Sequence, residues 1–146
     1  MKKKLILFIT VLAAALLLAG CEKHAYSIST NIFRYSTGKS FNDVTNKLSL
    51  SVGETAYIIA TSSSGTPLEG GVYSVSASPV AEPATEENPN PQTPSEQKAV
   101  KVAADGTFEG RPCIVVNAVS AGNASVSLNY EVMGFKLYKT ITVTVK

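Results

Sequence analysis

The sequence has little of the chemistry that catalytic and metal sites require. It contains one histidine, His24, two cysteines, Cys21 and Cys113, and no tryptophan. A structural zinc site takes four Cys or His ligands at set spacings, which these residues cannot supply. The chain also lacks a Gly-x-Ser-x-Gly nucleophile elbow and a phosphate-binding glycine-rich loop. We therefore expect no enzymatic activity, no catalytic residues, no metal site and no cofactor.

Carboxylates offer little more. A glycosidase needs two carboxyl groups fixed across a cleft. Glu86 and Glu87 are adjacent, but they lie in a segment that we expect to be a mobile loop. Calcium binding there is one interpretation, because calcium takes several oxygen ligands. Solvated charge is the interpretation that we prefer. His24 has no neighbouring polar cluster, and we expect it to be a solvated side chain.

No apolar run reaches the roughly 20 residues that a spanning helix needs. The longest extends from Leu5 to Leu18, is interrupted only by Thr10, and follows three consecutive lysines at positions 2–4. A basic start followed by a short apolar run is typical of a secretion signal. The sequence therefore predicts a cleaved signal peptide at residues 1–20.

The end of this run resembles the lipobox of bacterial lipoproteins, in the residues Leu18-Ala19-Gly20-Cys21. The resemblance implies a diacylglyceryl group on the Cys21 sulfur and cleavage by signal peptidase II before Cys21. Residues 21–25 would then form a lipidated tether, and the membrane would be a partner through Cys21. Glu22 stands where an aspartate would resemble an inner-membrane retention signal, which favours the outer membrane of the cell envelope.

Removal of the signal changes the charge of the chain. Three lysines leave with it, so Lys+Arg falls from 13 to 10 against 11 Asp+Glu, and the mature net charge is −1. No basic block remains, which argues against nucleic-acid binding. Cys21 is used by the lipid, so Cys113 has no cysteine to pair with. It lies in an apolar run, and we expect a buried small side chain rather than a reactive thiol.

The mature chain has the pattern of an all-β protein. Residues 48–52 alternate strictly between apolar and polar side chains. Residues 126–132 and 137–145 also place most apolar side chains on one face, with Lys139 among them, and they predict a hairpin. No segment shows a helical period. Short strands separated by turns favour a single immunoglobulin-like antiparallel β-sandwich over residues 26–146, with Tyr26–Tyr35 as a first strand or an extended lead-in.

Turn and loop signals divide these strands. Asn42-Asp43 and Asp105-Gly106 both read as turns. Residues 79–97 hold five of the seven prolines and four glutamates without a Lys or Arg. This composition predicts an exposed loop. The flanking segments are short for two independent cores, so we prefer one domain with an inserted loop to two domains with a linker.

Four stretches resemble the bacterial immunoglobulin-like repeat of the Big_2 class. The first is Leu-Ser-Leu-Ser-Val-Gly-Glu-Thr-Ala at 48–56; the others lie at 102–108, 118–126 and 139–146. These motifs mark strand ends and turns, including a turn at Asp105-Gly106. The resemblance implies an immunoglobulin-like fold and says little about activity.

Exposed aromatic side chains are the remaining candidates for a binding site. Phe135 lies at the predicted hairpin tip, and Tyr138 lies on the strand face opposite Leu137 and Ile141. We expect a non-catalytic envelope lipoprotein that acts in adhesion, assembly or spacing. An accessory lipoprotein that binds an envelope protein or glycan is the alternative. Inhibition of a protease by the loop at 79–97 is a further one.

Overall fold

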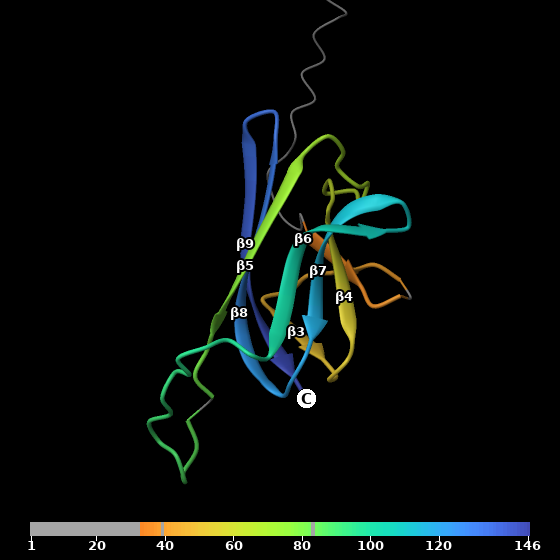
Figure 1. Cartoon of the computed structure of the whole chain (residues 1–146). Coiled ribbons are helices and arrows are strands. Elements are labelled where there is room, and N and C mark those ends of the chain that lie inside the picture. Colours follow the sequence, from red (N-terminus) through yellow and green to blue (C-terminus); the bar gives the residue numbers. More distant parts are fainter. Residues whose placement is uncertain (1–32, 39, 83) are drawn as a thin grey trace, which may run out of the picture.

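The computed structural model describes residues 33–38, 40–82 and 84–146, and this part of the chain contains strands and no helix (Figure 1). The strands are β1 (Phe33–Ser36), β2 (Asn42–Asp43), β3 (Lys47–Leu50), β4 (Thr55–Ala60), β5 (Val72–Pro79), β6 (Val100–Phe108), β7 (Arg111–Ala118), β8 (Gly122–Val132) and β9 (Phe135–Val145). No helix of the described residues could cross a membrane. The predicted signal peptide, Cys21, the tether and residues 26–32 lie outside them.

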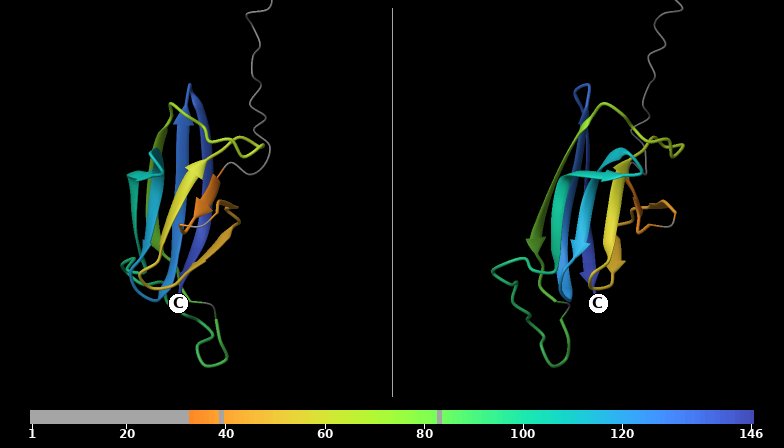
Figure 2. Two further views of the ribbon diagram at one scale, coloured as in Figure 1. Left: turned by 90° about the vertical axis from the view of Figure 1, so that its right-hand side faces the viewer. Right: turned by 45° about the vertical axis from the view of Figure 1, so that its right-hand side comes forward.

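The strands form two sheets packed face to face (Figure 2). The strand order is β2-β1-β4-β7-β6 in the first sheet and β3-β9-β8-β5 in the second. An immunoglobulin sandwich places its strands A, B, E and D in one sheet and C, F and G in the other. Strands β1, β4, β7 and β6 match the first set, and β5, β8 and β9 match the second. The predicted β-sandwich is confirmed.

One strand pair runs parallel. β3 pairs with β9 from Lys47 beside Thr142 to Leu50 beside Val145, whereas the other strand pairs are antiparallel. The Lys146 N–H donates to Leu50 O at 3.0 Å and closes the ladder. The second sheet is therefore mixed, a detail that the predicted antiparallel sandwich did not include.

The core follows the alternation of the sequence. In the hairpin of β8 and β9, Val126, Leu128, Ile141 and Val143 are at most 1% exposed and face the first sheet. Burying each such side chain contributes about 1.5–3 kcal/mol. Cys113 is fully buried among the strands, and desolvation by this burial raises the pKa of its thiol. Its side chain is thus a core residue, as the sequence indicated.

Two predicted turns are wrong. Asn42–Asp43 forms the short strand β2 against β1, with an Arg34–Asp43 ion pair of 2.9 Å. Asp105-Gly106 lies within β6, where the register shifts between Ala103 and Gly106 as a β-bulge. A Cβ on Gly106 would lie 2.1 Å from a methyl of Val115, so this glycine allows close packing instead of a turn.

The segment predicted as an inserted loop, residues 79–97, connects the two sheets. β5 ends at Pro79 and β6 begins at Val100, and the chain between them projects from one end of the sandwich (Figure 1). Its return is held by hydrogen bonds: the Gln97 side chain bonds both backbone groups of Val100, and Ala99 O accepts the Val119 N–H at 2.8 Å. The loop therefore lies outside the packed layers.

Candidate functional site

The outer face of the second sheet is covered by neutral polar side chains. We call this surface the polar face; its members come from β5, β8 and β9 and are Ser74, Ser76, Ser78, Ser125, Ser127, Asn129, Tyr138, Thr140, Thr142 and Thr144. They form cross-strand rows, since Ser76 pairs with Ser127 and Ser127 with Thr140. The charged side chains Glu131 and Lys136 pair at 3.5 Å at one end of the face.

Hydrogen bonds connect the centre of the polar face. The Thr140 hydroxyl donates to Tyr138 Oη at 2.8 Å, and Ser127 Oγ lies 3.2 Å from the same oxygen. In the neighbouring row, the Asn129 amide donates to Ser74 Oγ at 3.0 Å. Neutral groups fixed in this way present both donors and acceptors to solvent.

Tyr138 lies along the sheet. Its own row contains Asn129, but its hydroxyl bonds Ser127 and Thr140 in the next row, so the ring extends over the surface. The side chain is nevertheless 67% exposed. The bonds with Ser127 and Thr140 lower its pKa. An open groove of about 580 Å³ is lined by Ser74, Val75, Ser76, Ser127, Asn129, Lys136 and Tyr138. One ring face is thereby available beside hydrogen-bonding groups.

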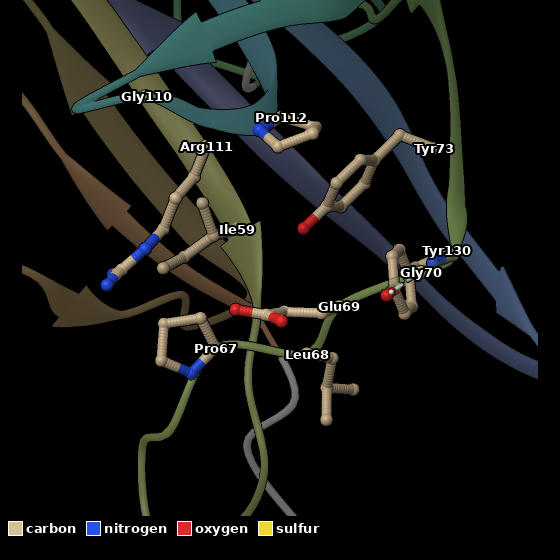
Figure 3. A pocket seen from close by; sticks show the side chains of 11 residues that line it. Ile59, Pro67, Leu68, Glu69, Gly70, Tyr73, Gly110, Arg111, Pro112 and Tyr130 are labelled. Atoms are coloured by element: carbon tan, nitrogen blue, oxygen red, sulfur yellow. Dashed lines mark hydrogen bonds between the residues drawn. The ribbon is translucent and has the colours of Figure 1, made fainter.

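A second hollow, of about 240 Å³, lies at one end of the sandwich (Figure 3). The segment between β4 and β5 and the turn between β6 and β7 enclose it. Its lining residues are Ile59, Pro67, Leu68, Glu69, Gly70, Gly71, Tyr73, Gly110, Arg111, Pro112 and Tyr130. The walls are mostly apolar, and Glu69 and Arg111 supply charges of opposite sign.

Two tyrosines support the hollow. Tyr73 and Tyr130 lie on adjacent strands with ring centroids 4.7 Å apart. The Ala60 N–H donates to Tyr73 Oη at 2.8 Å, and the Gly71 N–H donates to Tyr130 Oη at 3.0 Å. Burial raises the pKa of Tyr73 to about 12, against the opposing effect of the Ala60 bond. Tyr73 is therefore protonated at neutral pH and holds the loop after β4 in place.

The Tyr73 hydroxyl borders this hollow. Figure 3 shows the Tyr73 hydroxyl pointing into the space beside Ile59 and Glu69. A raised pKa makes Tyr73 a weak acid, and its ring serves the packing of the loop. Across residues 33–38, 40–82 and 84–146, no three His, Cys, Asp or Glu side chains are grouped so as to hold a metal ion.

Most other aromatic side chains pack against one another. On the first sheet, Tyr57 stacks on Phe108 with centroids 4.5 Å apart, and Phe41 meets Phe108 edge-on at 5.6 Å. These rings are half-buried. Their mutual contacts hold the segment before β2 against the sheet, which is the packing role expected for aromatics in strands.

The structure separates the two predicted binding residues. Phe135 and Tyr138 are 48% and 67% exposed, but they lie on opposite sides of β9. Tyr138 joins the polar face, while Phe135 belongs to the hairpin tip. The end hollow was not predicted, because residues 67–71 and 110–112 meet only in three dimensions. The adjacent glycines Gly70 and Gly71, close to Tyr73, were the one sequence feature that pointed to this hollow. The chain needs a glycine there, because a Cβ on Gly71 would lie 2.2 Å from the Tyr130 ring.

Comparisons with known proteins add little. No protein-family model matches this chain, and a search of curated proteins found no match. One solved structure that it resembles is a nucleoside hydrolase-related hypothetical protein from Saccharophagus degradans, described as associated with carbohydrate metabolism. The TM-score is 0.37 at 14% identity, over 82% of this chain and 27% of that chain. This chain thus spans about a quarter of that protein, and a likeness at this level implies neither a shared family nor a shared activity.

Proposed function

We propose that this protein is a cell-envelope lipoprotein, anchored through lipid on Cys21, whose immunoglobulin-like domain acts in adhesion without catalysis. The anchor rests on the lipobox at residues 18–21 and the basic, apolar segment before it. The adhesive role rests on one structural observation, the polar face centred on Tyr138. Its partner is a neutral glycan.

The chemistry of the polar face matches that of an uncharged sugar chain. Serine and threonine hydroxyls and the Asn129 amide offer donors and acceptors in rows, and sugar hydroxyls require both. The ion pair of Glu131 and Lys136 lies at one end of the face, and Lys47 of β3 lies beside Thr142 at its edge. The members of the face itself are neutral, so a charged polymer would find little complementary potential there.

Tyr138 supplies the apolar contact that hydroxyls cannot. Its ring lies along the sheet with 67% of the side chain exposed, held by Ser127 and Thr140. The C–H groups of a pyranose ring pack on such an aromatic face while its hydroxyls reach the neighbouring rows. Because the ring is already positioned by hydrogen bonds, binding costs little side-chain ordering.

Affinity electrophoresis tests the face. The mature domain would be run through gels that contain neutral polysaccharides of glucose, mannose or galactose, and through gels with a charged polysaccharide. We expect retardation in a neutral gel, and its loss in Tyr138→Ala. Phe135→Ala is the matched control, because it removes an exposed aromatic from the other side of the same strand. Equal retardation of Tyr138→Ala and the unaltered protein would exclude this face.

Membrane fractionation tests the anchor separately. Cys21→Ala removes the thiol that the lipobox chemistry requires, so we expect the variant to leave the membrane fraction and to retain its first twenty residues. Lys23→Ala, two residues away, should remain anchored and cleaved. A Cys21→Ala protein that is still cleaved and membrane-bound would contradict the lipoprotein assignment.

A further inference from the structure

The tip of the β8–β9 hairpin carries an exposed apolar side chain at a strained backbone position. Val132 pairs with Phe135, which leaves Met133 and Gly134 as a two-residue turn with φ of 48° and 80°. A turn with two positive φ values is type I′ and favours Asn-Gly or Gly-Gly. Met133 is instead 87% exposed. A large apolar side chain is thus kept in solvent where a small polar one would fit better.

Other apolar side chains extend this tip. Phe135, the first residue of β9, is 48% exposed, and Val72, which pairs with Glu131 on the opposite face of the sheet near the tip, is 73% exposed. The adjacent charges of Glu131 and Lys136 compensate each other at 3.5 Å. The tip is therefore apolar, and the two charged side chains nearest to it cancel each other.

The tip lies at the end of the sandwich where the described chain begins. Phe33 pairs with Ala60 at the end of β4, and the segment after β4 leads to Val72, beside the tip. Figure 1 shows the β8–β9 hairpin rising at this end, whereas the loop after β5 projects from the opposite one. Phe33 and Met133 therefore mark the same end of the domain.

The length of chain between Phe33 and Cys21 limits how far this end can lie from the lipid. The two residues are twelve positions apart. A fully extended chain covers at most 3.6 Å per residue, or about 40 Å here. Because the described chain begins at Phe33, at the same end as Met133, the proposed anchor on Cys21 is connected to the domain at the end that carries the tip.

We infer that the hairpin tip, through Met133 and Phe135, inserts into the interface of the bilayer that carries the anchor. This inference rests on the proposed lipidation for its orientation. The contact would hold the domain in one attitude on the membrane, with the tip as a second, non-covalent attachment. Apolar side chains at the headgroup boundary are favourable, and they would fix the orientation of a domain that the diacylglyceryl group on Cys21 already holds at the membrane.

A single introduced tryptophan reports on this contact, because the chain has none. The full lipidated protein would be reconstituted in neutral phosphatidylcholine vesicles with and without brominated acyl chains. Phe135→Trp should show blue-shifted emission and quenching by the brominated lipid. Val52→Trp is the control: Val52 is 54% exposed at the opposite end, where its N–H bonds Lys146 O. It should show neither effect.

The outcomes separate the tip from the anchor. Protein that fails to float with the vesicles lacks the proposed anchor. Protein that floats, but in which the Phe135→Trp emission is neither shifted nor quenched, overturns the tip contact and leaves a protein partner for the tip. Adding Met133→Asn to Phe135→Trp keeps the type I′ turn and should reduce the quenching. Undiminished quenching in that double variant would also count against the inference.

Discussion

At the scale of single residues, Met133 combines a left-handed φ of 48° with a large exposed side chain. The left-handed backbone conformation costs residues other than glycine about 1–2 kcal/mol, and it costs asparagine less than most. We expect Met133→Asn to raise the free energy of unfolding by about 0.5–1 kcal/mol, measured by urea denaturation. Met133→Ala keeps the strained φ of 48° and loses little packing, so its stability should be unchanged. An Asn variant no more stable than the Ala variant would contradict this.

Tyr73 makes the stability of the domain depend on pH at the alkaline end. Its pKa is about 12 in the folded protein, against 10.0 for an unperturbed tyrosine, so the folded state holds the proton more tightly. The folded state is favoured fully below pH 10, and this advantage is lost as the pH rises towards 12. We expect Tm to fall through this window and to fall less in Tyr73→Phe. The same slope in both proteins would assign the effect to other groups.

Tyr73→Phe also tests the hydrogen bond to the loop after β4. The variant leaves the Ala60 N–H without its acceptor, which costs about 1–3 kcal/mol for a buried donor. Thermal unfolding at pH 7 measures this cost. Tyr138→Phe is the control, since it removes a hydroxyl that bonds side chains on an exposed surface. Equal stability of the Tyr73→Phe and unaltered proteins would mean that water replaces the lost acceptor.

At the scale of elements, the loop after β5 contributes little to the packed layers. We expect replacement of residues 84–95 by four glycine and serine residues to change the free energy of unfolding by no more than about 1 kcal/mol, because closure entropy varies slowly with length. Extending the replacement to residue 99 removes the Gln97 side-chain bonds and the buried Ala99 side chain, and should destabilise the domain clearly. Chemical denaturation of both variants checks this. A large loss in the shorter replacement would give the loop a structural role.

The elements also show what sequence patterns can and cannot predict. The β8–β9 hairpin was predicted because both strands alternate and are adjacent in the chain. The parallel pairing of β3 with β9 was not, since alternation in residues 48–52 says which face is buried but not which strand lies alongside. Asp105-Gly106 has the composition of a turn, yet pairing with β7 continues through it as a bulge. Gly106 packs closely against Val115 of β7, a contact that exists only in the folded structure and that the sequence pattern does not show.

The site shows the same division. Tyr138 was predicted to be accessible because it lies on the strand face opposite Ile141, and its side chain is indeed exposed. Its hydrogen bonds depend on Ser127, a residue of the neighbouring strand, and therefore on the cross-strand register. The polar face could be predicted strand by strand from the sequence. Its assembly into one surface required the order β9-β8-β5.

At the scale of the whole molecule, the small charge of the mature chain bears on recognition. Residues 21–146, the proposed mature chain, carry a net charge of −1, and the polar face is built from neutral groups. We expect glycan affinity to change less than about twofold between 50 mM and 500 mM NaCl, a range that screens interactions between exposed charges. Titration calorimetry at the two salt concentrations measures this. A strong loss at high salt would indicate an ionic partner at Glu131 or Lys136.

The position of β9 has a consequence for how the molecule is made. This strand comprises the last residues of the described chain, yet it lies inside the second sheet, between β3 and β8. Until residues 135–145 are available, β3 has no neighbour in its sheet and the core lacks one of its walls. Synthesis proceeds from the opposite terminus, where the proposed export signal lies. Under the proposed export, the sandwich therefore cannot close before residues 135–145 have been delivered.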